Sequence, residues 1–448
     1  MTTLSSSTKH SDLLHCSVTP QKMSPVAQAA VERTLQLAQS ASPVVEKSSE
    51  LYQVAKARFA ALGFPTQKME DWKYTRLTDF LQHEFALPVA KVTLSINDIE
   101  PYMPDFPVYS VVFVDGYFAP NLSDEMPKGV QLRQMQTGEP LLADAEDYLA
   151  EPFAALNLLL AQSGVVLEIA KGVQVDLPIF LLQVNTQPHT TVQWHHQVKV
   201  VEGAEVQLLQ EAVALGEAMS SPVWNNGVMD ISVAENASCQ QLILQRLPET
   251  HYCFDTQFIK QAKYSRFHSY FVSTGGKLCR HQNHLLMADE SVESVQNSAC
   301  IATGQQLMDS RTDTTHGSTY GVSRQLHKFV LTDQSIGVFD GMIYVDRGAI
   351  KTDGQMDNKN LILSNEAKVN AKPKLEIYAD DVKCSHGSAT GQMDKDQVFY
   401  LQARGIKKTD AVALITQAFA LEAVEEIASP NLKKLAQQAV QAKLDGIF

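Results

Sequence analysis

The sequence predicts a mainly β protein with helical ends. Three observations support this: short β-branched runs, tight polar turns between them, and helix signals confined to the two ends of the chain. The β-rich runs fill residues 165–392. A mainly helical region, 1–164, precedes them and contains an early apolar strand at 108–114, and a second helical region, 393–448, follows. We therefore expect three regions with a β core in the middle.

Related turn-and-strand phrases recur within this β core. The turns at 347–349, 365–367 and 380–382 begin 18 and 15 residues apart. Imperfect repeats of this kind fit a β-solenoid, in which each coil buries the apolar face of its neighbour. The strands of an ordinary β-sandwich recur in a comparable way. The pattern alone leaves both architectures open.

Proline, serine and glycine mark the ends of the expected N-terminal helices. The Ser-Pro pairs at 24–25 and 42–43 each predict an N-cap followed by proline at the first helical position. Gly63 is placed to end the second of these helices. A last helix is expected over about 153–162, closed by Gly164.

Three helices are expected after the β core. The first runs from Asp394 to Arg404 and stops at Gly405. The second begins after Thr409 as N-cap and reaches about residue 428, and a Ser-Pro pair at 429–430 opens the third. Apolar helices at the end of a solenoid form either a cap or a docking surface, and the pattern itself favours a cap.

Composition excludes several classes of function. The chain has 448 residues and a net charge of −13, which disfavours nucleic acid as its main partner. No apolar run is long enough for a membrane span, and the polar first 23 residues predict a tail without a secretory signal. The six cysteines include no CxxC pair. These features predict a cytoplasmic protein with reduced thiols.

Cys384 and His386 form the most informative pair in the chain. They lie two residues apart in a predicted strand, so their side chains leave the same face. A thiol and an imidazole suit iron, zinc or copper. Two ligands are too few for a closed four-coordinate site. If a metal binds here, other segments or a second chain must supply the remaining ligands.

The segment that contains this pair also carries a family resemblance. Residues 376–406 resemble the C-terminal signature of the SufB/SufD family of iron–sulfur cluster assembly scaffolds. The similarity extends to upstream motifs that include Ser323-Arg324-Gln325-Leu326, Asn358-Lys359-Asn360-Leu361 and Glu70-Asp71-Trp72-Lys73-Tyr74. The last of these motifs, with the short N-terminal region, is similar to the SufD branch and not to the longer SufB branch.

The resemblance implies both a fold and a function. It implies a right-handed parallel β-helix between two helical regions, and a non-catalytic scaffold that pairs with a SufB-like chain. A transient iron–sulfur cluster would form at that interface, shared with the partner and not bound permanently. His386 is the expected direct ligand, with Cys384 as a ligand, a sulfur relay or a neighbour. A homodimer is expected when the partner is absent.

The resemblance also implies a partner that hydrolyses ATP. In this family the C-terminal helical region engages a SufC-like ABC-type ATPase, which favours docking over a cap. Phe399, Tyr400, Arg404 and Gly405 are the expected docking residues. The chain has no GxxxxGK[ST] loop of its own, nor a GxSxG or HExxH motif. ATP hydrolysis is therefore expected in the partner.

Two other functions are weighed against the scaffold. A β-solenoid enzyme acting on polysaccharide would need clustered carboxylates and usually a secretory signal. A self-sufficient metal store needs more ligands than one chain offers. Cys279, His281 and His284 have metal-like spacing, but on a strand His284 takes the opposite face. The segment 70–74 is expected to pack the helical region onto the first coil, with protein docking as the alternative.

Overall fold

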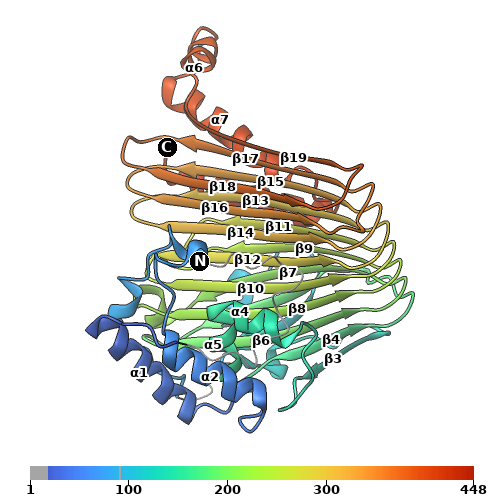
Figure 1. Ribbon diagram of the computed structural model, residues 1–448. Coiled ribbons are helices and arrows are strands. Elements are labelled where there is room, and N and C mark those ends of the chain that lie inside the picture. The colour runs from blue at the N-terminus through green and yellow to red at the C-terminus, as the bar shows by residue number, and fades with distance from the viewer. Residues whose placement is uncertain (1–18, 90–91) are drawn as a thin grey trace.

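Two long parallel sheets form the body of the protein (Figure 1). The computed structural model describes residues 19–89 and 92–448, so the predicted tail up to residue 18, with Cys16, lies outside the described residues. From β4 to β19 each strand pairs in parallel with the strand two places along the chain, so consecutive strands alternate between the sheets. At the N-terminal end, β1 pairs with β5 and β2, and β3 pairs with β4. This arrangement is a parallel β-solenoid, and it excludes the sandwich.

The strands of the ten-stranded sheet, from one edge to the other, are β19 (Lys383–Gln392), β17 (Asp353–Ile362), β15 (Val322–Leu331), β13 (Glu293–Ala302), β11 (Arg266–Ser273), β9 (Ser238–Gln245), β7 (Glu205–Ala214), β5 (Ile179–Asn185), β1 (Tyr109–Val114) and β2 (Tyr117–Phe118). Those of the nine-stranded sheet are β18 (Lys368–Ile377), β16 (Ile336–Val345), β14 (Leu307–His316), β12 (Leu278–Met287), β10 (Tyr252–Gln261), β8 (Trp224–Val233), β6 (Thr191–Val200), β4 (Val165–Ile169) and β3 (Val130–Gln134).

The repeated turns of the β core share one backbone conformation. At the corner where the nine-stranded sheet passes to the ten-stranded sheet, one non-glycine residue of each coil from β8 onward has a positive φ of 54–62°. Its amide donates to a carbonyl of the next coil, for example Tyr320 to Ile350 at 3.1 Å. This ladder ends at Asp381, directly before β19, and the amide of Lys383 donates to Thr352 at 2.8 Å. The corner therefore fixes where β19 begins. The residues of the ladder are Asn236, Tyr264, Ser291, Tyr320, Lys351 and Asp381.

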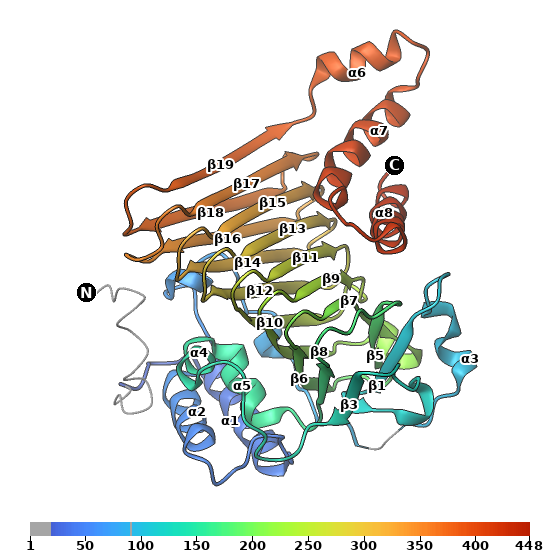
Figure 2. The same ribbon diagram turned by 90° about the vertical axis from the view of Figure 1, so that its right-hand side faces the viewer.

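N-terminal helices cover the outer face of the nine-stranded sheet (Figures 1 and 2). They are α1 (Pro25–Ser40), α2 (Glu50–Leu62), α4 (Ala145–Ala150) and α5 (Pro152–Leu160), with α3 (Ile96–Ile99) apart from them. Their apolar faces join aromatic residues of the sheet, and the rings of Phe153 and Phe254 stack at 3.6 Å. Burial of this aromatic surface is the main force that holds the helices in place.

The helix boundaries test the predictions at this end. Ser24 caps α1 as expected, and Gly63 ends α2 with a φ of 69°. The prediction that the pair at 42–43 begins a helix is wrong, because α2 starts at Glu50 with Ser49 as its N-cap. The hydroxyl of Ser49 performs the capping in place of Ser42, and Val44 and Val45 between them are buried in the apolar core without forming a helix.

C-terminal helices cover the other sheet (Figure 2). They are α6 (Lys395–Gln402), α7 (Lys408–Leu421) and α8 (Pro430–Asp445). Ser429 caps α8 as predicted, whereas Lys407 and not Thr409 is the N-cap of α7. The end of α7 and the whole length of α8 pack on the outer face of the ten-stranded sheet, while α6 extends away from the body. In the described part of the chain, no helix is long and apolar enough to cross a membrane.

Candidate functional site

The last coil of the solenoid carries the cysteine and histidine predicted as ligands. Strand β19 is the edge of the ten-stranded sheet, and β18 is the edge of the nine-stranded sheet. Cys384 and His386 stand opposite Gly354 and Met356 of β17. Because Met356 faces the interior and Cys384 packs on the same apolar cluster, both candidate residues lie on the inner face of this coil.

Exposure separates the two residues. Cys384 is half-buried, and burial raises the pKa of its thiol above the ordinary value, against a hydrogen bond from the backbone of Gly354. His386 is exposed, because no described coil covers the inner face beyond β19. The imidazole is therefore free to meet a ligand or a second chain, while the thiol is mostly protonated without a metal.

The described residues do not complete a metal site. No group of three or more histidine, cysteine, aspartate or glutamate side chains within 19–89 and 92–448 could hold a metal ion. Cys279 packs in the interior, whereas His284 lies on the outer face and pairs with Glu151 at 3.3 Å. Those candidates from the sequence thus face opposite sides of the sheet. The last coil offers at most two ligands of a shared site.

The predicted docking residues lie on a segment that projects from the body. We call this segment, α6 and α7 with the turn between them (residues 395–421), the arm. Helix α6 follows β19 after two residues. Phe399 and Tyr400 are 70% and 57% exposed, and the guanidinium of Arg404 lies 3.4 Å from the centre of the Tyr400 ring. Gly405 has a φ of 87°, which lets the chain turn toward α7. Exposed aromatic rings on a helix with one buried residue, Val398, are typical of a surface that a partner covers.

The base of this arm is anchored by a buried lysine. The Lys328 side chain is 1% exposed, its ammonium bonds to Glu422 after α7, and it lies 4.1 Å from the centre of the Phe419 ring. Lys359 reaches the same carboxylate at 3.3 Å. Burial lowers the pKa of Lys328, and Glu422 opposes that shift. Sequence reasoning missed this contact, since Lys328 and Glu422 are 94 residues apart and no spacing signal connects them.

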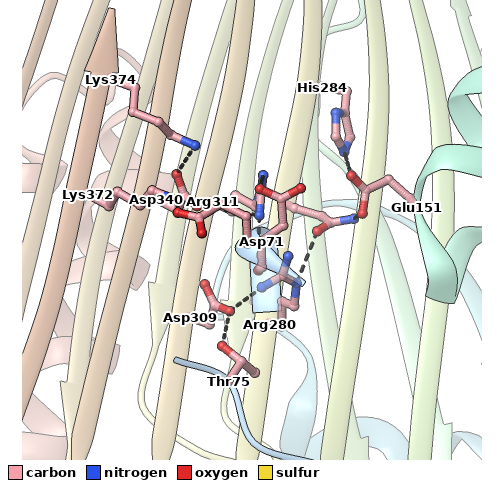
Figure 3. Close-up of polar contacts among 12 residues, drawn as sticks. Asp71, Thr75, Glu151, Arg280, His284, Asp309, Arg311, Asp340, Lys372 and Lys374 are labelled. Atoms are coloured by element: carbon pink, nitrogen blue, oxygen red, sulfur yellow. Dashed lines mark hydrogen bonds and ion pairs between the residues drawn. The ribbon is translucent and has the colours of Figure 1, made fainter. Parts of the chain in front are cut away.

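The segment at 70–75 joins the N-terminal region to the middle and last coils (Figure 3). Trp72 is 2% exposed, and the guanidinium of Arg280 lies 4.0 Å above its ring. Asp71 pairs with Arg311 at 2.6 Å, and Glu70 pairs with Lys372 of β18. The segment is therefore a packing element. The expected contact with the first coil is wrong, because these partners belong to β12, β14 and β18.

A charged pair lies beside this segment. Burial disfavours the charge on Glu151, but His284, Arg311 and Arg280 outweigh that effect and lower its pKa to about 2. The pKa of His284 is raised, since Glu151 outweighs the effect of burial. The two groups are thus held as an ion pair between α5 and β12, where they hold the helix to the sheet.

Comparison with known proteins identifies the family. The model of the SufBD core domain of the SUF system for FeS cluster assembly matches residues 182–419, and the model of the SufBD N-terminal region matches 31–181. The chain belongs to the SufB/SufD family. The resemblance seen in the sequence is thereby confirmed, and membership places the chain in iron–sulfur cluster assembly.

Individual relatives agree over most of their length. The chain is 33% identical to the iron–sulfur cluster assembly protein SufD of Escherichia coli over 390 residues, covering 86% of this chain and 90% of that one. It is 30% identical over 403 residues to a SufBD family protein of Synechocystis sp., covering 86% and 88%. Protein ABCI7, chloroplastic, of Arabidopsis thaliana is 28% identical over 401 residues, covering 85% and 83%.

Proposed function

We propose that the chain is a non-catalytic scaffold subunit of an iron–sulfur cluster assembly complex. It pairs through its last coil with a SufB-like chain and contributes His386, with Cys384 beside it, to a nascent cluster. The observation that carries this proposal is the open inner face of the last coil, which presents an exposed imidazole and a half-buried thiol.

The edges of the last coil support a partner chain. Among residues 19–89 and 92–448, strands β18 and β19 each have a neighbour on one side only, and their residues are exposed or half-buried. Unpaired backbone groups at a sheet edge favour pairing with another chain. Strands of a partner added there would cover His386 and bring further ligands to it. A second copy of this chain offers the same edges, which is the basis for a homodimer when the partner is absent.

The chemistry of the pair suits a transient cluster. A neutral imidazole and a thiolate are both ligands for iron. The raised pKa of Cys384 keeps its thiol protonated until a metal displaces the proton. Half a ligand set binds weakly by itself, so the cluster would be shared with the partner and released. A cytoplasmic location with reduced thiols fits this chemistry.

The arm supplies the second contact of the scaffold. The exposed rings of Phe399 and Tyr400 would bind a SufC-like ABC-type ATPase, with Arg404 and Gly405 shaping that surface. ATP hydrolysis would then occur in the partner. The arm joins β19 directly, so force from the ATPase reaches the strand that carries His386.

No observation favours the polysaccharide enzyme. Several carboxylates on the outer face of the nine-stranded sheet are paired with cations, as Asp340 is with Lys374 at 2.9 Å. Glycoside hydrolysis needs two carboxyl groups that are open to the sugar. N-terminal helices cover much of this face as well.

The test is an anaerobic purification of the tagged chain from its native cytosol, with iron, sulfide and partners measured. We expect a SufB-like chain and an ATPase to co-purify, and His386→Ala to lower iron and sulfide while the complex stays assembled. Ser385→Ala, next to His386 but on the outer face of β19, is the matched control. An unchanged cluster yield in His386→Ala would remove this residue as a ligand.

A further inference from the structure

Two buried asparagines lie beneath the strand that carries His386. Asn358 and Asn360 are 1% and 3% exposed, and both point from β17 into the interior. Their amides bond to each other, Asn360 Nδ2 donating to Asn358 Oδ1 at 2.7 Å and Asn358 Nδ2 to Asn360 Oδ1 at 3.1 Å. Asn358 also donates to the carbonyl of His327 at 3.3 Å, so β15 helps to fix the pair.

The two asparagines also form hydrogen bonds with side chains of the neighbouring strand, β19. Ser388 Oγ donates to Asn358 Oδ1 at 3.2 Å, and Asn360 Nδ2 donates to Thr390 Oγ1 at 3.1 Å. Asn360 Nδ2 also lies 3.3 Å from the carbonyl oxygen of Ala389. Ser388 is the next inward residue after His386. The contacts therefore hold β19 immediately after the candidate ligand.

Strand β19 needs such contacts because its own side chains determine its pairing and register with β17 only weakly. From Gly387 to Gln392 it contains only glycine, serine, alanine, threonine and glutamine, with no large apolar side chain. Strands that are rich in glycine and polar on both faces are prone to slip or fray. The corner turn fixes the beginning of β19, and β17 is its sole strand neighbour in the described sheet. Its other end leads straight into the projecting arm.

We propose that Asn358 and Asn360 are positioning residues that hold β19 against β17. They keep His386 on the inner face while a bound ATPase exerts force on the arm. The functional part rests on the proposed role of His386. Each amide is held in one orientation by its hydrogen bond to the other. Both amides therefore already point toward the hydroxyl groups of β19 before that strand pairs with β17. A buried amide without its partners would carry a penalty, which opposes fraying.

The test removes the hydroxyls of β19 and leaves the asparagines in place. In Ser388→Ala/Thr390→Val the asparagines still bond to each other and to His327, so the fold is retained. Hydrogen exchange of amides 388–392 in the isolated full-length chain should be about tenfold faster, the equivalent of ~1.4 kcal/mol, while exchange in β15 stays unchanged. Ser388→Thr/Thr390→Ser keeps both hydroxyls and should keep the wild-type exchange.

The same variants are then assembled with the SufB-like chain and the ATPase, with His386→Ala beside them. Faster exchange and a low iron and sulfide content, both restored by Ser388→Thr/Thr390→Ser, support the inference. Unchanged exchange overturns it, whatever the cluster content. Faster exchange with a full cluster content, while His386→Ala is low, also overturns it, because the ligand then needs no such support. If His386→Ala has a full cluster content, the proposed function fails, and the exchange result alone decides whether the hydroxyls hold the strand.

Discussion

Arg311 on β14 and Asp71 on the segment before α3 are 240 residues apart in the chain, yet their side chains pair at 2.6 Å. Arg311 also lies 3.5 Å from Asp340 on β16 and donates to the carbonyl of Asp71 at 3.1 Å. The guanidinium is nearly buried, so its charge is compensated by these carboxylates and not by water. It joins the N-terminal segment to two neighbouring coils (Figure 3).

Replacing this arginine should destabilise the protein strongly. Arg311→Met leaves Asp71 without its cation, whereas Asp340 keeps Lys374 at 2.9 Å. Because the Asp71 side chain is 49% exposed, we expect a loss of roughly 2–3 kcal/mol, below the figure of about 3–5 kcal/mol for a fully buried pair. Thermal unfolding should therefore begin at a clearly lower temperature. Arg266→Met is the matched control, because Arg266 pairs with Glu205 at 3.6 Å and both side chains are about half exposed, where such a pair contributes about 0–1 kcal/mol. Equal midpoints for the two variants would contradict the assignment of Arg311 as a buried link.

The ion pair of Glu151 and His284 predicts a dependence of stability on pH. The pKa of Glu151 is about 2 in the folded chain, below its unfolded value, so its stabilising contribution is present above about pH 4.5 and is lost as the pH falls toward 2. The raised pKa of His284 acts in the opposite direction: its contribution is present below its unfolded value and is lost as the pH rises through the folded one.

The measurement is the thermal midpoint of wild type and Glu151→Gln between about pH 3 and 8. The difference between the two proteins should be largest near pH 5–6, where both groups are charged, and should shrink toward pH 3. Glu205→Gln, which removes a half-exposed carboxylate paired with Arg266, should give a small difference throughout. A difference for Glu151→Gln that does not change with pH would mean that packing, and not charge, holds α5 to β12.

Glu422 should determine how firmly the arm is attached. Glu422→Gln leaves the buried ammonium of Lys328 without a carboxylate, and we expect a loss of roughly 1–3 kcal/mol, less than for a fully buried pair because Glu422 is half exposed. The loss should be local, so proteolysis between α7 and α8 should become faster while the solenoid stays intact. Lys359→Met removes the more exposed cation of the cluster and should have little effect. Equal proteolysis of both variants would argue against the anchor.

Structural features that depend on neighbouring residues or on a regular repeat could be predicted from the sequence. Features that depend on contacts between distant residues could not. The serine N-caps at 24 and 429 and the stop at Gly63 depend on a few neighbouring residues, and all three are confirmed. The facing of Cys384 and His386 follows from the two-residue period of a strand. The choice between solenoid and sandwich came from the family resemblance, because both folds repeat short strands.

Long-range pairing explains what remained hidden. Nothing near Asn358 in the sequence signals that its amide meets Ser388 in the next coil, since that contact depends on how the coils stack. Thr409 looked like an N-cap because its hydroxyl could cap a helix, but the helix begins earlier and the hydroxyl bonds to Asp410 at 3.1 Å. Helix ends vary by one or two residues between equally valid assignments, so a capping preference alone does not locate the first residue of α7.

The exposed rings of the arm lead to the last prediction. Phe399 and Tyr400 bury little surface within the described chain, so Phe399→Ser/Tyr400→Ser should leave the free energy of unfolding within about 0.5 kcal/mol of wild type. The same change should weaken association with a SufC-like ATPase about a hundredfold or more, since aromatic anchors at an interface contribute about 2 kcal/mol or more each. Ile96→Ser, which removes a similarly exposed apolar side chain on α3, is the matched control. Titration calorimetry with the purified ATPase decides the matter, and equal affinity for the double variant and the control would place the docking surface elsewhere than on α6.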